Sequence, residues 1–141
     1  SVNELRPDAL EQRDLLSAIH KMISQMGAAS KVTITLDNSA GRLSFGEDEE
    51  EVIYRIIQES ITNSIRHGKA DTVGIRMTRE YNIVTITVRD NGVGAPNIEP
   101  GFGLTHMKER LDMLGGKIQV DGSDGFCLVA EIPIRWGTEN D

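Results

Sequence analysis

The chain has 141 residues, of which 38% are hydrophobic, and this is the size and composition of one domain with a single core. Its formal net charge of −7 argues against a surface that binds nucleic acid or anionic membranes, since both attract basic patches. A lone cysteine, Cys127, excludes a disulfide within the chain, and no apolar stretch has the length of a membrane span or the pattern of a signal peptide. We therefore expect a soluble, acidic, intracellular domain.

The first half of the chain predicts a helix, a strand and a second helix. Apolar residues recur at helical spacing over residues 8–26, and we expect Gly27 to end this helix. Residues 31–36 alternate between polar and apolar and predict a strand. The second helix is predicted over residues 48–67. We interpret its acidic opening run, residues 47–51, as favourable for the positive end of the helix dipole rather than as a functional patch.

The second half is richer in strands. Residues 91–102 contain several Gly and Pro residues and no periodicity, which predicts a loop long enough to serve as a lid. The remaining elements are strands over 72–77, 83–88, 117–120 and 127–134, with a helix over 104–114. Three helices and about five strands, with the late strands joined by short turns, indicate an α+β fold. We expect a two-layer α/β sandwich, in which the helices cover one face of a mixed, mostly antiparallel sheet.

A polar stripe lies on the second helix. Glu59, Asn63, Arg66 and His67 fall within an arc of about 100° when successive residues are placed at helical spacing. Such a stripe can simply face water. It can also bind a ligand, because the carboxamide oxygen of Asn63 is a fitting ligand for Mg²⁺, which takes few protein ligands and completes its octahedron with phosphates and water.

A second polar motif follows the strand over 83–88, at Asp90-Asn91-Gly92-Val93-Gly94. One interpretation is a hairpin turn, although the sequence after Gly94 does not resume the alternation that a hairpin requires. In the functional interpretation, the Asp90 carboxylate accepts a hydrogen bond from the exocyclic amine of a base, and the glycines let the backbone approach that base. Such a site favours adenine over guanine, because a carboxylate is repelled by a carbonyl.

A third motif, Gly101-Phe102-Gly103-Leu104, directly precedes the helix over 104–114. Backbone N–H groups and the dipole at a helix N-terminus attract anions, and glycines admit a phosphate without a clash at Cβ. The three motifs together supply a metal ligand, an acceptor for a base and donors for phosphates, which predicts a nucleotide site.

These motifs resemble the N, G1 and G2 boxes of the ATP-binding domain shared by gyrase, Hsp90, histidine kinases and MutL, the Bergerat fold. Within that family the sequence is most similar to sensor histidine kinases that partner NarL-type response regulators. The strings that carry this resemblance are Leu5-Arg6-Pro7, residues 54–63, Arg66-His67, residues 107–111, Leu114-Gly115-Gly116 and Ile132-Pro133. The resemblance covers nearly the whole chain.

The resemblance implies a role for each matching position. Asn63 would bind Mg²⁺ and Asp90 would read adenine. Glu59 aligns with the position at which hydrolytic relatives hold the base that activates water, so we expect Glu59 in a supporting catalytic role beside Asn63. The implied ATP-binding residues are Asn63, Arg66, His67, Asp90, Gly92, Gly94, Gly101, Gly103, Leu104 and Thr105.

The sequence departs from the family pattern at two places. Gly125-Phe126 stands where the family usually has Gly-Thr, so the hydroxyl often found near the adenine is missing. Residues 95–100 of the lid carry no Lys or Arg, so other groups must meet the charge of the triphosphate.

No histidine of the chain has the sequence context of a phosphoacceptor. His20 has no neighbouring Asp or Glu, which indicates an ordinary helix-face histidine, whereas His106 follows the third motif and either approaches the phosphates or lies on the surface. We expect the acceptor histidine on a separate domain. Residues 1–10 would then be the end of a linker from that domain, and residues 11–141 the catalytic domain.

The resemblance therefore implies the catalytic domain of a sensor histidine kinase, which uses ATP and Mg²⁺ to phosphorylate a histidine on a phosphoacceptor and dimerisation domain. The implied downstream partner is a NarL/LuxR-type response regulator. We expect a cytoplasmic location, as the cytoplasmic part of a membrane-bound sensor, with no nucleic-acid binding and no membrane insertion by this part. Two alternatives remain open at this point: an anti-sigma-type serine kinase, and a degenerate docking module of the same fold.

Overall fold

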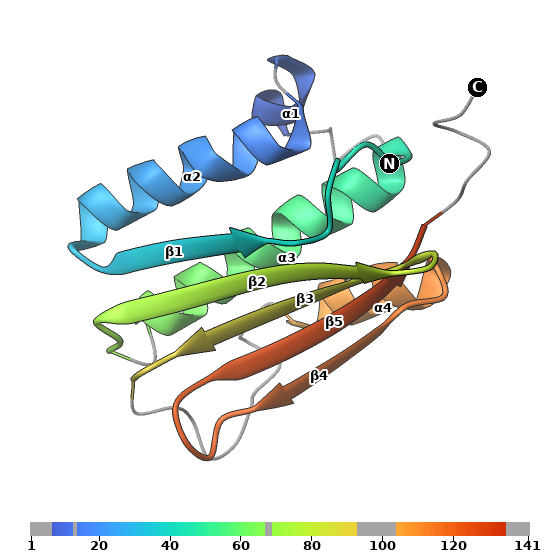
Figure 1. Cartoon of the computed structure of the whole chain (residues 1–141). Helices are drawn as coiled ribbons and strands as arrows, with labels where there is room; N and C mark the ends of the chain where they lie inside the picture. Colours follow the sequence, from blue (N-terminus) through green and yellow to red (C-terminus); the bar gives the residue numbers. More distant parts are fainter. Residues whose placement is uncertain (1–6, 13, 67–68, 93–103, 135–141) are drawn as a thin grey trace.

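The computed structural model describes residues 7–12, 14–66, 69–92 and 104–134. These residues form the helices α1 (Asp8–Gln12), α2 (Leu15–Ser30), α3 (Glu47–Arg66) and α4 (Leu104–Met113), and the strands β1 (Thr33–Asn38), β2 (Thr72–Glu80), β3 (Ile83–Asp90), β4 (Lys117–Asp121) and β5 (Cys127–Pro133). The strands make one sheet in the order β1-β2-β3-β5-β4 (Figure 1). Only β1 and β2 pair in parallel, and the other three pairings are antiparallel, which confirms the predicted mixed, mostly antiparallel sheet.

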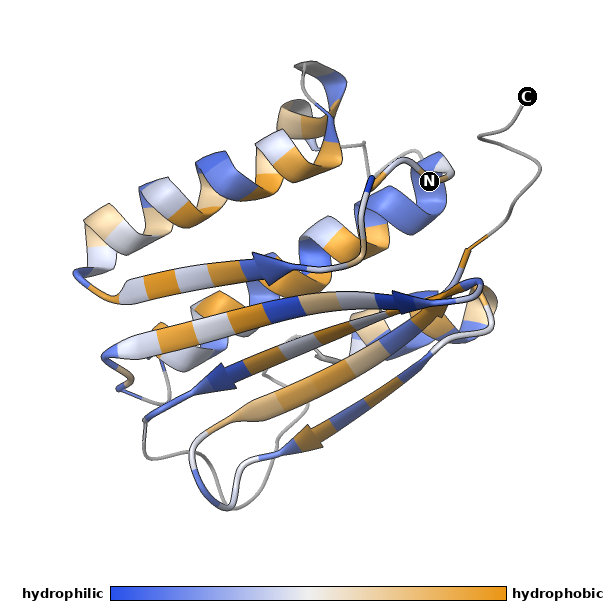
Figure 2. Cartoon of the chain, in the orientation of Figure 1, coloured by the Kyte–Doolittle hydropathy of each residue, from blue (hydrophilic) through white to orange (hydrophobic). Residues whose placement is uncertain are grey.

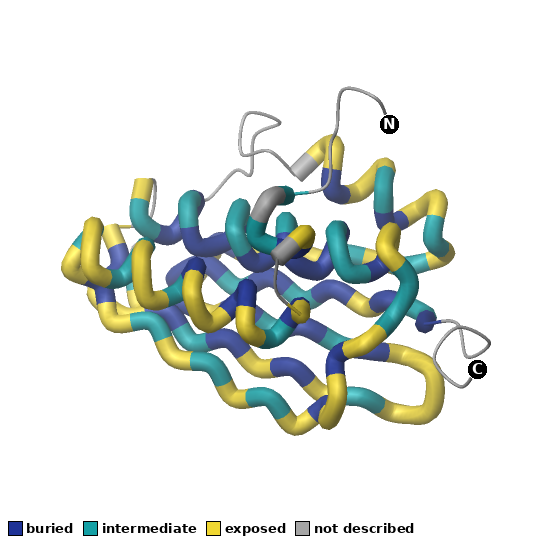
Figure 3. The backbone as a smooth tube through the Cα atoms, turned by 90° about the horizontal axis from the view of Figure 1, so that it is seen from above, coloured by how far each residue is buried: buried dark blue, intermediate teal, exposed yellow. Residues whose placement is uncertain are grey.

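One face of the sheet is buried, and the helices cover it. Along β3 the apolar residues Val84, Ile86 and Val88 are buried, whereas the threonines between them are only half-buried. Figure 2 shows this alternation of hydrophobic and hydrophilic residues along the strands, and Figure 3 shows the matching alternation of buried and less buried positions. The two-layer arrangement expected from the sequence is therefore confirmed.

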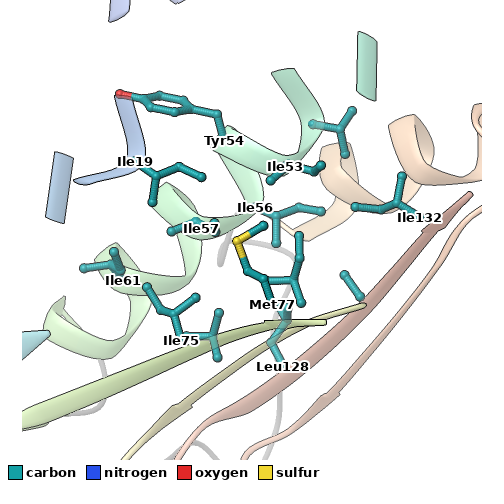
Figure 4. Packing of buried hydrophobic residues seen from close by; sticks show 14 of the residues in the cluster. Ile19, Ile53, Tyr54, Ile56, Ile57, Ile61, Ile75, Met77, Leu128 and Ile132 are labelled. Carbon is teal, nitrogen blue, oxygen red and sulfur yellow. The ribbon is translucent and has the colours of Figure 1, made fainter. Parts of the chain in front are cut away.

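The core lies between α3 and the central strands (Figure 4). Four isoleucines of α3 are at most 1% exposed, and they pack with Met77 of β2 and Leu128 of β5; these are Ile53, Ile56, Ile57 and Ile61. Ile19 of α2 and Ile132 of β5 extend this cluster. The apolar stripe of α3 is thus fixed on the sheet, and this fixes the direction in which its polar stripe points.

The N-terminal helix differs from the prediction, because α1 and α2 replace the single helix expected over residues 8–26. Asp14, with ψ 168°, is the N-cap of α2, and its Oδ1 accepts a hydrogen bond from the backbone N–H of Ser17 at 2.8 Å. An extended N-cap cannot continue a preceding helix, so the capping side chain divides the segment. The described residues therefore hold four helices rather than three, and Leu10 of α1 is buried in the core.

Gly27 does not end α2, contrary to the prediction. The helix continues to Ser30 and is capped by Lys31, whose φ of 63° is left-handed and whose N–H donates to the Gly27 carbonyl at 2.8 Å. A Cβ at Gly27 would lie 3.1 Å from the Val32 carbonyl oxygen, so the glycine allows the chain to fold back closely over the last turn. Because Lys31 caps the helix, β1 begins at Thr33, two residues later than predicted.

The other elements follow one another in the predicted order, and their ends differ from the predicted ones by at most three residues. β2 and β3 are longer than expected and are joined by a turn at Tyr81, whose φ is 57°. Gly115, with a φ of 81°, turns the chain from α4 into β4. His67, the predicted last residue of α3, lies outside the described residues, as do residues 93–102 of the predicted lid. Of the helices in the described ranges, none combines the length and apolarity needed to cross a bilayer.

Candidate nucleotide site

Helix α3 brings a buried amide to the site. Its first turn holds four acidic residues, which stabilise the positive end of the helix dipole as predicted. Nearer its C-terminus, Asn63 is 3% exposed, Glu59 is half-buried, and Arg66, the last residue of the helix, is exposed. The stripe therefore does not simply face water: its Asn63 member lies in the interior, where an amide needs polar partners. His67 lies outside the described residues.

Asp90 ends β3 with its carboxylate buried. The residue is 7% exposed, and its Oδ1 accepts two hydrogen bonds, from the backbone N–H of Gly92 and from that of Phe126, each at 2.9 Å. The second oxygen, Oδ2, is buried and has no hydrogen-bond partner. One oxygen thus fixes the orientation of the carboxylate, and the other is left to accept a hydrogen bond from an occupant of the site.

The hairpin interpretation of this motif is wrong. β3 pairs with β2 and β5, and the next strand in the sequence, β4, comes only after α4. Asn91 instead links two strand ends, because its Oδ1 accepts the backbone N–H groups of Asp71 at 2.9 Å and Thr72 at 3.0 Å. This side chain fixes the end of β3 beside the start of β2. From the sequence, Asn91 is only a member of the motif and has no predicted role of its own.

Gly125 and Phe126 form the other wall around Asp90. Gly125 has a φ of 70°, and a Cβ there would lie 2.7 Å from the Asp90 carbonyl oxygen and 3.3 Å from Oδ1. The backbone of Phe126 both donates to Asp90 Oδ1 and accepts from the Asp90 N–H. In the sequence, these two residues stand out only because a hydroxyl is missing at Phe126. In the structure, Gly125 leaves room for the Asp90 carboxylate, and Phe126 binds Asp90 through its backbone.

The third motif lies mostly outside the described residues, which include none of Gly94, Gly101 and Gly103. Helix α4 does begin at Leu104, as predicted, and Thr105 is exposed in its first turn. An ion pair holds α4 against α3, since Arg110 Nη1 lies 3.1 Å from Glu51 Oε2 and both side chains are largely buried. This pair positions the helix whose N-terminus is expected to meet phosphates.

In the described part of the chain, neither His20 nor His106 makes a hydrogen bond or ion pair with Asp90 or Asn63. His20 is exposed on α2, as expected of a helix-face histidine. The His106 side chain is 83% exposed, with Nδ1 3.8 Å from Glu109 Oε1. It lines a hollow of about 420 Å³ between α4 and the start of α3, next to Asp48 and Val52. Val52 precedes Asn63 by eleven residues, or about 16 Å along a helix, so this hollow is distinct from the Asn63 end.

The predicted residues of α3 and β3 come together at one end of the sheet. The Ser64 carbonyl accepts the N–H of Ala70 at 3.3 Å, and Asp71 and Thr72, the next two residues, bind Asn91. The C-terminal turn of α3 is therefore joined to the end of β3 through a few residues. Asn63 and Asp90, far apart in the sequence, belong to the same end of the molecule.

Comparisons with known proteins agree with this geometry. A family model described as histidine kinase-, DNA gyrase B-, and HSP90-like ATPase matches residues 47–135. The signal transduction histidine-protein kinase/phosphatase UhpB of Salmonella typhimurium is 27% identical over 138 residues, which cover 96% of this chain and 28% of UhpB. The sensor histidine kinase ComP of Bacillus subtilis is 31% identical over 138 residues, which cover 94% of this chain and 18% of ComP. The chain spans about a third or less of the length of these two relatives.

Solved structures share the fold. The catalytic domain of histidine kinase ThkA superposes with a TM-score of 0.66 at 18% identity, covering 86% of this chain and 92% of that domain. The histidine kinase domain of the Erythrobacter litoralis EL346 blue-light activated kinase gives a TM-score of 0.69 at 19% identity, with 85% of this chain and 65% of that domain covered. The expected Bergerat fold is thus confirmed. Since the family model covers more than half of the residues, the chain belongs to the histidine kinase-, DNA gyrase B- and HSP90-like ATPase family.

Proposed function

We propose that this chain is the ATP-binding catalytic domain of a sensor histidine kinase of the subfamily that partners NarL-type response regulators. It binds Mg·ATP and presents the γ-phosphoryl group to a histidine on a separate phosphoacceptor domain, in the cytoplasm. The observation that carries the proposal is the buried, unpartnered Oδ2 of Asp90, held in place by two backbone N–H groups. The relatives named as sensor histidine kinases support the choice of reaction.

Asp90 is proposed to select the base. Its Oδ2 can accept from the exocyclic amine of adenine, whereas the carbonyl at the same position of guanine would meet an acceptor. Gly92, whose N–H holds Oδ1, and Gly125, which leaves no side chain against the carboxylate, keep the backbone close to the base. These groups bind and orient the nucleotide and do not react.

The phosphate end is proposed to lie between α3 and α4. Asn63 would hold Mg²⁺ through its carboxamide oxygen, and the ion would neutralise charge on the triphosphate when bound. The proposed contacts to the phosphates come from Arg66 and His67 and from the turn before α4, at Gly94, Gly101, Gly103, Leu104 and Thr105. Glu59, on the same face of α3, is proposed to orient the metal-bound water or the acceptor. Catalysis of this kind consists mainly of positioning and charge neutralisation.

A calorimetric titration tests the site. The chain should bind Mg·ATP and Mg·ADP with one site and bind Mg·GTP at least tenfold more weakly, since each mispaired buried polar group costs about 1–3 kcal/mol. Absence of heat with Mg·ATP, together with no competition by ADP, would instead favour a degenerate docking module.

Labelling with γ-labelled ATP tests the reaction. The chain alone should incorporate no stable label, and addition of the phosphoacceptor domain of the same kinase should give an acid-labile phosphohistidine on that domain. A stable phosphohistidine on residues 1–141 would contradict the division of labour proposed here. An acid-stable phosphoserine on a protein partner would support the serine kinase alternative.

A further inference from the structure

Strand β4 forms one edge of the sheet. In the strand order β1-β2-β3-β5-β4 it is the last member, and among the described strands it pairs with β5 alone (Figure 1). Backbone groups along a strand point alternately to its two sides. Those of β4 that point away from β5 therefore have no strand beside them within the described residues, and an open edge of this kind can pair with another chain.

The inner side of β4 is apolar and only partly covered. Ile118 and Val120 pack against the core, but both are half-buried. The residues opposite them on β5, Ala130 and Leu128, are 0% exposed. Burial therefore declines from β5 to β4, and a further strand beside β4 would remove more apolar surface from water.

The outer side of β4 carries opposite charges at its two ends. Lys117, Gln119 and Asp121 are exposed and alternate with the half-buried residues. Lys117 and Asp121 lie about 14 Å apart along the strand, too far to pair within one copy. The Asp121 carboxylate is held in place, because its Oδ1 accepts the backbone N–H and the hydroxyl of Ser123 at 2.9 and 2.7 Å. Charged residues usually deter pairing at an edge, but these two complement each other when the strand is reversed.

The sequence of β4 is thus complementary to itself in one register. When two antiparallel copies are centred on Gln119, Lys117 lies opposite Asp121 of the second copy, and Ile118 lies opposite Val120 of the second copy. Outer residues then meet outer residues, and inner ones meet inner ones. A register shifted by one residue opposes inner residues to outer ones, and a register shifted by two separates both charge pairs. Each matched pair contributes about 0.2–1 kcal/mol.

We propose that β4 is an interface for a second copy of this chain, in which the two β4 strands pair antiparallel about a twofold axis at Gln119. The two five-stranded sheets then form one continuous sheet, with both layers of helices on the same face. Such an interface uses the same residues on both copies, as is usual in homodimers. It is small, so the isolated chain associates weakly. The inference does not depend on nucleotide binding, and its test is made without nucleotide.

Disulfide cross-linking tests the register, in a chain whose lone cysteine is replaced by Cys127→Ser. Gln119→Cys should cross-link readily under mild oxidation, because the two residues at the axis have Cβ atoms about 4.5–5.5 Å apart, close to the separation in a disulfide. Lys117→Cys and Asp121→Cys are the controls. Each alone should cross-link slowly, whereas an equal mixture of the two should form mixed dimers. If Gln119→Cys cross-links no faster than either control alone, the proposed register is wrong.

A charge reversal tests the complementarity. Sedimentation equilibrium should show a concentration-dependent dimer of the wild type. Lys117→Glu and Asp121→Lys should each weaken association about tenfold, since two attractive pairs become repulsive. The double variant should regain the wild-type affinity.

The double variant also separates contacts between copies from contacts within one copy. Lys117 lies opposite Glu131 of its own chain, so a single reversal also changes the monomer. The double variant keeps both of these changes, and only pairing between copies explains a recovered dimer. Thermal unfolding at low concentration checks that each variant is folded. A wild type that stays monomeric up to its solubility limit, or a double variant as weak as the single ones, overturns the inference.

Discussion

Asp90 and Phe126 are joined by two hydrogen bonds that involve only the backbone of Phe126. The Phe126 N–H donates to Asp90 Oδ1 at 2.9 Å, and the Asp90 N–H donates to the Phe126 carbonyl at 3.0 Å. The second bond continues the ladder between β3 and β5, whose last paired residues are Arg89 and Cys127. The orientation of the carboxylate therefore depends on the path of the chain at residue 126. A phenylalanine there is compatible with a correctly placed Asp90.

Asp90→Asn should weaken adenine nucleotides while leaving the fold intact. The amide can keep one oxygen toward the N–H groups of Gly92 and Phe126, but it then presents an NH₂ group where Oδ2 faced the exocyclic amine. Two opposed donors cost about 1–3 kcal/mol, or roughly five- to 150-fold in affinity. Calorimetry with Mg·ATP measures this. Asp121→Asn is the control, because Asp121 also ends a strand but its carboxylate binds Ser123 at the surface. Equal affinity in Asp90→Asn and the wild type would remove Asp90 from base recognition.

Gly125→Ala should damage both stability and nucleotide binding. The substitution places Cβ 2.7 Å from the Asp90 carbonyl oxygen and leaves alanine in a left-handed conformation. Gly41→Ala separates these effects, because Gly41 has a φ of 83° and no atom within 4 Å of its Cβ position. The control should lose about 1–2 kcal/mol of unfolding free energy through backbone strain alone. Gly125→Ala should lose more, and it alone should lower ATP affinity. Urea unfolding and calorimetry decide, and similar results for the two variants would mean that the close approach to Asp90 is unimportant.

The core and the order of helices and strands along the chain follow from patterns that a single sequence displays. Alternation over β3 and helical spacing over α3 are signals of local composition, and the structure confirms both elements within two residues. Helix ends were less predictable, because they depend on contacts with distant atoms. Gly27 has the composition of a helix end, yet it serves the close return of the chain past Val32, and Lys31 is the residue that caps the helix.

In the candidate site, too, local patterns are predictable from the sequence and contacts between distant residues are not. Asn63 and Asp90 were recognised because a motif surrounds each of them in the sequence. The partners that hold Asp90 could not be recognised, since Phe126 acts through its backbone, and a backbone contact 36 residues away leaves no trace in residue type. The structure also leaves the buried hydroxyls of Ser60 and Ser64 without hydrogen-bond partners, which the sequence does not predict. The rotamer of a helix serine decides whether its hydroxyl donates to a backbone carbonyl of the preceding turn.

Asn63→Asp should impair the use of Mg·ATP more than it impairs folding. The side chain keeps its size, but a negative charge would stand beside the triphosphate, in a position that is 3% exposed and therefore weakly screened. We expect ATP affinity to fall at least tenfold, with recovery at high Mg²⁺ concentration if the metal meets the added charge. Titrations at two Mg²⁺ concentrations measure this. The expectation is wrong if ATP affinity is unchanged at both Mg²⁺ concentrations. It is also wrong if the variant is already unfolded without ATP, so that loss of the fold explains the loss of affinity.

Asp14→Ala should destabilise the chain at neutral pH and much less in acid. The backbone and side-chain hydrogen bonds from Ser17 hold the pKa of Asp14 below its ordinary value. A carboxylate whose pKa is lower in the folded state contributes stability above its unfolded pKa, and this contribution is lost as the pH falls through the folded pKa. Urea unfolding of both proteins at neutral pH and at the lowest pH that preserves the fold gives the difference. A difference that does not shrink in acid would show that the N-cap acts without its charge.

Arg110→Met should loosen α4 and weaken ATP binding at a distance from the nucleotide. The Arg110 and Glu51 side chains are 24% and 12% exposed and join α4 to α3, whereas the Lys108–Asp112 pair on the outer side of α4 is 65% and 58% exposed. Loss of a largely buried, charge-assisted hydrogen bond costs about 1.5–3 kcal/mol, while exposed pairs contribute about 0–1 kcal/mol. Lys108→Met is therefore the control. Urea unfolding should rank the two variants in that order.

The same pair of variants tests whether α4 positions the phosphate end. Helix α4 begins at Leu104, so a shift of its axis moves the turn that is proposed to meet the phosphates. Arg110→Met should reduce affinity for ATP more than affinity for adenosine, because adenosine makes no phosphate contacts. Lys108→Met should leave both affinities unchanged. Calorimetry with the two ligands measures the ratio. A proportionate loss for ATP and adenosine in Arg110→Met would mean that α4 supports the site as a whole and does not specifically position its phosphate end.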